Sequence, residues 1–345
     1  MSSPRPVSWY RSPISTEDFK SLHVRSDWRG WLQTLGYIGV LFLTGASVLT
    51  AARHHAPWYF VVALIFLNGM AYSFLPNGMH ELGHGTVFKT KFWNGFFERI
   101  LAFLGWMNFA MFTESHSRHH RYTLHPPDDG EVVFPVRLFF RQCFTNGIVN
   151  PRRFWWTLKY TIRIARGKFE GDWELICYPP SDPAKRRLPM GWARGILLGH
   201  ALILAASIYF HLWLLPVVTT LAPFYGEWLF FLCNNAQHTG LQDKVADFRL
   251  CCRTITLNPV VEFMYWHMNY HTEHHMYAAV PCYRLKRLHE LVKHDLPPCP
   301  HGVVATWKEI IAILEKQRID PTYQYAAPLP APAASDSRKA VVAAI

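Results

Sequence analysis

WLQTLGYIGVLFLTGASVLTAA, residues 31–52, and WYFVVALIFLNGMAYSFLP, residues 58–76, contain no charged side chain. A helix needs about 20 predominantly apolar residues to cross the hydrocarbon core of a bilayer. Both stretches are about that long, and the break between them, Arg53-His54-His55-Ala56-Pro57, suits a tight turn. We therefore expect the two stretches to form a hairpin of membrane-spanning helices.

A second apolar region, residues 195–233, contains a single charged residue, Glu227. The region is about twice as long as one span, and Pro216 lies near its middle. We expect two further spanning helices there, 195–213 and 214–233, joined by a tight turn.

The basic charge of the chain is distributed unevenly about these spans. The formal net charge is +11, and every lysine and arginine except Arg53 lies in residues 1–30, 77–194 or 234–345. With four spans these three segments share one side of the membrane, which the positive-inside rule makes the cytoplasmic side. The membrane accounts for the positive charge, so we expect no nucleic-acid partner. A bacterial inner membrane and an endoplasmic reticulum both fit.

These patterns predict an all-α integral membrane protein with four transmembrane helices in two hairpins and a cytoplasmic helical cap. Residues 92–113 are apolar but carry Glu98 and Arg99 near their start. We expect an interfacial or half-buried helix there rather than a fifth span, because the flanking histidine motifs then stay on one side of the membrane. We divide the chain into an N-terminal cytoplasmic segment, 1–30, a membrane domain, 31–325, and a tail, 326–345. The tail is rich in alanine, proline and serine, a composition typical of disorder.

Histidines are the side chains most suited to carry chemistry here. Nine of the 19 fall into four clusters beyond the ends of apolar stretches. These are His80-x-x-x-His84, His116-x-x-His119-His120, the single His238, and His271-x-x-His274-His275. Residues i, i+3 and i+4 of a helix are neighbours on one face, whereas adjacent histidines diverge and can reach two neighbouring ions. Nine nitrogen donors are too many for one metal ion, and two ions fit them.

The identity of the metal does not follow from the donor type alone. Imidazole suits zinc, copper, iron and nickel, and a structural zinc site needs only four ligands. A redox pair beside apolar helices favours activation of O₂, for which iron is the usual metal. Metal-bound histidines commonly donate their second N–H to a carboxylate. Seven carboxylates lie near the clusters: Glu81, Glu114, Asp128, Asp129, Glu131, Glu262 and Glu273.

The three histidine boxes and their placement relative to the spans resemble those of the membrane-bound fatty acid desaturase family. The likeness covers residues 31–300. It implies an O₂-dependent oxidoreductase with two iron ions held by the nine histidines. It also implies electrons from an external carrier protein of the ferredoxin or cytochrome b5 type. Asn234 matches an asparagine that contacts iron through water in acyl-CoA desaturase relatives; an ordinary residue at a helix end is the alternative.

The resemblance implies that the protein introduces a double bond into a fatty-acyl or other lipid-like chain. The segment 269–275 also resembles the H-x-E-H-H boxes of sphingolipid desaturases and carotenoid ketolases. Hydroxylation or ketolation of a lipid, a carotenoid or another small molecule is therefore the alternative reaction. A histidine-rich metal transporter is the alternative outside enzymes, although transporters usually place their sites near the membrane midplane.

Overall fold

The computed structural model describes residues 6–132, 144–145 and 147–331. Throughout these residues the regular elements are helices, and the all-α class predicted from the sequence is confirmed for them. In chain order the elements are α1 (Thr16–Leu22), α2 (Asp27–Arg53), α3 (Trp58–Tyr72), α4 (Leu75–Gly83), α5 (Lys91–Leu104), α6 (Phe109–Tyr122), α8 (Pro151–Ala165), α9 (Asp172–Cys177), α10 (Pro183–Tyr209), α11 (Leu215–Val218), η1 (Ala222–Phe224), α12 (Trp228–Asn235), α13 (Phe248–Cys251), α14 (Pro259–Met264), α15 (His271–Met276), η2 (Cys282–Arg284), α16 (Leu285–Val292), η3 (Lys293–Asp295) and α17 (Gly302–Ile319).

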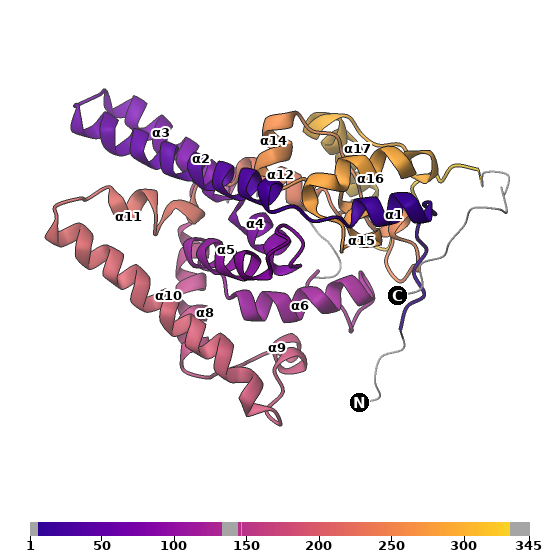
Figure 1. The fold of residues 1–345 in the computed structure, drawn as a ribbon, viewed down its shortest axis with the longest axis horizontal. Helices are drawn as coiled ribbons and strands as arrows, with labels where there is room; N and C mark the ends of the chain where they lie inside the picture. Colours follow the sequence, from indigo (N-terminus) through magenta and orange to yellow (C-terminus); the bar gives the residue numbers. More distant parts are fainter. Residues whose placement is uncertain (1–5, 133–143, 146, 332–345) are drawn as a thin grey trace.

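Helices α2 and α3 form an apolar hairpin that extends away from the rest of the molecule (Figure 1). The side chain of Ser26 caps the start of α2. At the far end His55 adopts a left-handed backbone conformation, with φ 54°, and Pro57 precedes α3. The outward side chains are apolar, and Phe42 is 71% exposed. Such a surface suits a lipid environment, because soluble proteins rarely expose large contiguous apolar patches.

Three helices of the described chain are long and apolar enough to cross a membrane. They are Asp27–Arg53, Trp58–Gly83 and Pro183–Tyr209. The second combines α3 with α4, so the predicted span 58–76 continues as helix into the first histidine box. The third is α10, which begins earlier than the predicted span 195–213.

The predicted fourth helix, 214–233, is wrong as a single continuous span. The segment divides into α11, the 3₁₀ turn η1 and α12. Pro223 lies within η1 and has no N–H to donate to a continuing helix. Gly226 then adopts a left-handed conformation, with φ 72°, and packs on the backbone of α3, where a Cβ atom would lie 2.6 Å from the Met70 nitrogen. This close contact with α3 fixes the position of the broken segment from α11 to α12, residues 215–235, which we call the return segment.

The apolar stretch 92–113 also divides, into nearly all of α5 and the start of α6, so it is not one helix as predicted. Trp106 lies between them in a left-handed conformation, with φ 56°. Its ring stacks on His200 of α10 at 4.1 Å between centroids, and its Nε1 donates to the Thr220 carbonyl at 2.9 Å. Neither α5 nor α6 belongs to the helices long and apolar enough to cross a membrane.

The N-terminal segment crosses the outer ends of two histidine-bearing helices. Trp9 Nε1 donates to the carbonyl of Arg121 in α6 at 3.0 Å. Arg11 Nε donates to the carbonyl of Met276 in α15 at 2.7 Å. These contacts tie the two helices together from outside.

The predicted disorder of the tail, 326–345, falls largely outside the described residues, because 332–345 are not among them. Residues 326–331 are described and contain no helix. The predicted disorder of the tail therefore stays a prediction.

Candidate metal centre

Four elements supply the nine histidines predicted as ligands. Helix α4 carries His80 and ends at His84, α6 carries His116, His119 and His120, the turn after α12 carries His238, and α15 carries His271, His274 and His275. Asn108 caps α6 by accepting from the Met111 amide. Helix α15 has only six residues, so its position depends on tertiary contacts rather than on intrinsic helix stability.

The nine histidines converge into two groups. One group contains His80, His84, His116, His120 and His274, and the other contains His119, His238, His271 and His275. Within each group, one ring nitrogen from every residue lies within 4.8 Å of those of the others. The four elements are far apart in the sequence, so only the folded chain brings these nitrogens together.

The division follows helical geometry rather than the order of the boxes. Histidines four residues apart, such as His116 and His120, share a group, whereas the histidine at i+3 joins the other group. At about 3.6 residues per turn, the i+4 side chain is rotated by about 40° and the i+3 side chain by about 60° the other way. Adjacent His119 and His120 therefore face different groups, as the spacing predicted.

The ring nitrogens that face the interior of the groups are mainly Nε2 atoms. In the first group, His116 Nε2 lies 2.6 Å from His80 Nε2 and 2.8 Å from His120 Nε2. In the second group, His271 Nε2 lies 2.9 Å from His238 Nε2. The interior of each group is thus lined by nitrogen atoms at close range.

The outer nitrogens of several rings are held by oxygen atoms. His116 Nδ1 lies 2.8 Å from Glu131 Oε1, and His119 Nδ1 lies 2.8 Å from Asp129 Oδ2. His238 Nδ1 lies 2.8 Å from the Cys251 carbonyl oxygen. A carboxylate or carbonyl can only accept, so Nδ1 carries the proton in these three rings and Nε2 presents a lone pair.

The carboxylate of Glu81 in α4 lies near two rings of the first histidine group, those of His80 and His274. Its Oε1 is 3.0 Å from His80 Nδ1 and 3.5 Å from His274 Nδ1. The residue is fully buried. The Nδ1 side of both rings faces this carboxylate, whereas His80 Nε2 lies 2.6 Å from His116 Nε2 and His274 Nε2 lies 3.2 Å from His120 Nε2.

Burial keeps most of these imidazoles neutral, which is the form that binds metals. It lowers the pKa of His84 and of His238 to about 3. Burial, reinforced by neighbouring histidines, also holds the pKa well below the ordinary value in a further set: His116, His120, His271, His274 and His275. For His119, burial is the largest effect and opposes protonation, but the hydrogen bond to Asp129 and the charges of Glu131 and Asp129 together outweigh it and raise the pKa.

The donor set fits metal ions. The Nε2 atoms of His80 and His120 cannot both be satisfied by His116 Nε2, because His116 carries its proton on Nδ1, facing Glu131, and its Nε2 has a single lone pair. Metal–imidazole bonds of about 2.0–2.1 Å put nitrogens on opposite sides of an ion about 4 Å apart, which agrees with the separations within each group. Each group therefore has the spacing and the neutral donors that a cation needs.

The remaining sequence candidates lie in other environments. Asn234 is half-buried in the last turn of α12, and its contact with iron through water stays a prediction. Glu114 pairs with Lys185 at 3.0 Å. Glu262 pairs with His267, whose Nδ1 lies 3.1 Å from Oε1.

One contact was missed from the sequence. Glu273 lies between His271 and His274 in the chain, but its fully buried carboxylate hydrogen-bonds to His289 of α16 and to Thr254. It anchors α15 to these two residues rather than orienting a histidine of the groups. Helix α16 has apolar residues at helical spacing and no metal-ligand spacing, so no signal in the sequence identified His289.

The fold and the site together define a class: a helical protein with apolar helices long enough to cross a membrane and a buried double cluster of histidines. The family model for fatty acid desaturases matches residues 56–307, which include all nine histidines, and the chain belongs to this family. Membership implies an oxidoreductase that acts on lipid chains. A comparison with curated proteins returned no significant match.

Proposed function

We propose that the protein is an O₂-dependent di-iron desaturase that introduces a double bond into a fatty-acyl or other lipid-like chain. The observation that carries the proposal is the division of nine histidines into two adjoining groups, each with nitrogens within 4.8 Å of one another. The first group would hold one iron and the second group the other. Bound there, the iron pair supplies the O₂ activation and C–H oxidation that no protein side chain provides.

The residues of the chain orient and insulate this centre. Glu131 and Asp129 fix the ring direction of His116 and His119, and such partners raise the basicity of a ligand. The low pKa values of the buried imidazoles keep the rings neutral at neutral pH, so one nitrogen of each ring has a lone pair for a metal. The apolar helices that approach the site provide a water-poor route for a hydrocarbon chain, which keeps reactive species away from solvent.

The membrane arrangement is part of the proposal. We place both histidine groups on the cytoplasmic face, with the loops after α2 and α10 on the opposite face. The broken segment from α11 to α12 completes the second hairpin. Aromatic residues, among them Trp58, Tyr209 and Trp213, are exposed near those two loops, and aromatic side chains favour the membrane interface. Electrons would come from an external carrier protein, and Asn234 would contact one iron through water.

The experiment that tests the function uses the full-length protein in cells and after purification. Lipids from cells with and without the gene are compared by mass spectrometry, with His119→Ala as the inactive control. A product two hydrogens lighter than its precursor supports desaturation. A product heavier by one oxygen identifies hydroxylation, and a product that gains one oxygen and loses two hydrogens identifies ketolation; either product overturns desaturation.

Purified protein separates the enzyme from a metal transporter. The enzyme should retain two irons per chain and consume O₂ when a chemical reductant is added. Metal that exchanges freely and crosses the membrane of reconstituted vesicles, without O₂ uptake, would overturn the proposal.

A further inference from the structure

The second histidine group depends on a short segment that contains no ligand. Residues 251–256, the central segment, run between the turn of His238 and the third histidine box. On one side the Cys251 carbonyl accepts from His238 Nδ1 at 2.8 Å. On the other side Thr254 Oγ1 accepts from the Thr272 amide at 3.3 Å. The central segment therefore sets the distance between His238 and the histidines of α15.

Within the central segment, Arg253 makes the largest number of contacts with the turn of His238. Its Nη1 donates to the Ala236 carbonyl at 2.6 Å and to the Thr239 carbonyl at 3.2 Å. Its backbone N–H donates to the Gln237 carbonyl at 2.8 Å. These three carbonyls flank His238 on both sides, so one residue holds the whole turn.

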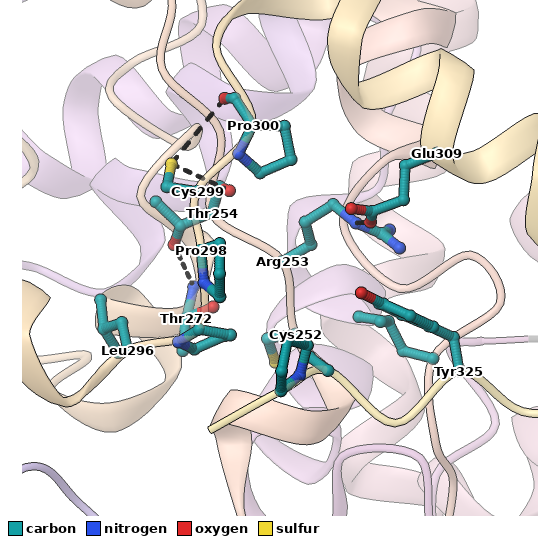
Figure 2. Close-up of a pocket in the computed structure, with 14 residues that line it drawn as sticks. Cys252, Arg253, Thr254, Thr272, Leu296, Pro298, Cys299, Pro300, Glu309 and Tyr325 are labelled. Carbon is teal, nitrogen blue, oxygen red and sulfur yellow. Dashed lines mark hydrogen bonds and ion pairs between the residues drawn. The ribbon is translucent and has the colours of Figure 1, made fainter. Parts of the chain in front are cut away.

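The guanidinium of Arg253 is buried and directed toward α17. Arg253 is 6% exposed, and its Nε lies 3.2 Å from Glu309 Oε1 of α17. Figure 2 shows the side chain extending toward Glu309 and Tyr325, on the far side of the central segment from Thr272. Among the described residues its Nη2 has no hydrogen-bond partner, and Arg253 lines a cavity of about 50 Å³.

His238 needs this support more than the other eight histidines do. The others lie on α4, α6 or α15 or at the end of α4, and each of those elements carries at least two of them. His238 is alone on a non-helical turn. The planar guanidinium of arginine can donate hydrogen bonds to two carbonyls and a carboxylate at once, an arrangement that a lysine ammonium does not reproduce.

We propose that Arg253 is a positioning residue that fixes the turn of His238 and thereby completes the second histidine group as a metal site. The inference rests on the proposed function, because it takes that group to bind iron. Arg253 touches no ligand side chain and acts through the backbone on either side of His238. It also links His238 to α17, because Glu309 balances the charge of the guanidinium.

The test compares Arg253→Ala and Arg253→Lys with the wild-type protein, all purified full-length in detergent. Iron per chain is measured while the free iron concentration is varied with a chelator. Loss of a residue that orients a ligand typically weakens metal binding by about 10–100-fold. We expect both variants to lose one of two irons at a free concentration at which the wild-type protein keeps both.

Arg249→Ala is the matched control. Arg249 lies four residues earlier in the chain, in α13, and pairs with Asp247 at 2.8 Å and Asp295 at 2.7 Å. It makes no contact with the turn of His238 among its described hydrogen bonds. We expect this variant to keep both irons even if its unfolding temperature falls.

A double variant separates positioning from general stability. In a His238→Ala background, Arg253→Ala should cause no further loss of iron, because its effect passes through the absent imidazole. Further loss in the double variant, or two irons held as tightly in both Arg253 variants as in wild type, would overturn the inference. A wild-type protein that binds no iron pair would overturn the proposed function instead, whatever the Arg253 variants do.

Discussion

The α2–α3 hairpin and the histidine centre distribute polarity in opposite ways. The hairpin turns apolar side chains outward, with Phe42 71% exposed. The centre buries its polar groups, and Glu81, Glu273 and His274 are inaccessible to solvent. The first arrangement is stable where lipid replaces water, and the second where each buried polar group has a partner or a metal. The comparison shows that apolar side chains are not always inside this protein and polar ones not always outside. The expected neighbours, lipid around the hairpin and ligand partners or metal in the centre, decide which side chains turn inward.

The largest effect is expected at the centre itself. His119→Ala removes a donor from the second group together with the hydrogen-bond partner of Asp129. Turnover should be lost and iron content should fall, while membrane insertion stays intact. His54→Ala, in the exposed loop at the far end of α2, is the control and should leave activity nearly unchanged. Activity in His119→Ala would remove that residue from the site, and an inactive His54→Ala would contradict the proposed membrane orientation.

Phenylalanine truncation compares the two environments directly. Phe88 is fully buried against Trp31 and Phe97, so Phe88→Ala should lower the free energy of unfolding by about 3–5 kcal/mol. Phe42→Ala, on the outward face of α2, should change it by no more than about 0.5 kcal/mol. Unfolding in detergent, followed by circular dichroism, measures both. Equal losses would mean that the outward face of α2 is covered by protein.

Substitution of a carboxylate that hydrogen-bonds to a histidine ligand measures how much that carboxylate contributes to iron affinity. Glu131→Gln keeps the shape of the side chain but removes the charge that faces His116 Nδ1. Iron affinity should fall by about 10–100-fold, measured by competition with a chelator. Glu170→Gln alters an exposed carboxylate 3.8 Å from Arg163 and should leave the affinity unchanged. A wild-type affinity in Glu131→Gln would show that the carboxylate does not tune the ligand.

The smallest effect is expected where the return segment packs on α3. A Cβ atom at Gly69 would lie 2.1 Å from the Tyr225 ring and 2.5 Å from its carbonyl oxygen. Gly69→Ala should therefore destabilise the fold by about 1–3 kcal/mol through overpacking. Gly39→Ala, in α2 with no atom within 4 Å, should stabilise it by up to about 1 kcal/mol through helix propensity. A neutral Gly69→Ala, in thermal unfolding, would show that the return segment moves freely against α3.

The sequence by itself determined the helical class, the apolar hairpin and the identity of the clustered histidines. Those features are local, because hydrophobic length and residue spacing are properties of neighbouring residues. Spacing also foretold that adjacent His119 and His120 would face different ways, since successive side chains on a helix point about 100° apart.

Tertiary structure alone decided the rest. The predicted fourth span breaks where Gly226 meets the backbone of α3, a contact between residues more than 150 positions apart in the chain. Glu131 and Asp129 face histidines of the two groups, whereas Glu273 faces His289 outside them. All three carboxylates were equally plausible partners of the grouped histidines in the sequence. Arg253 reaches the turn of His238 only because the central segment lies beside it. Such pairings depend on which surfaces of the folded chain meet, and the order of residues along one helix does not contain that information.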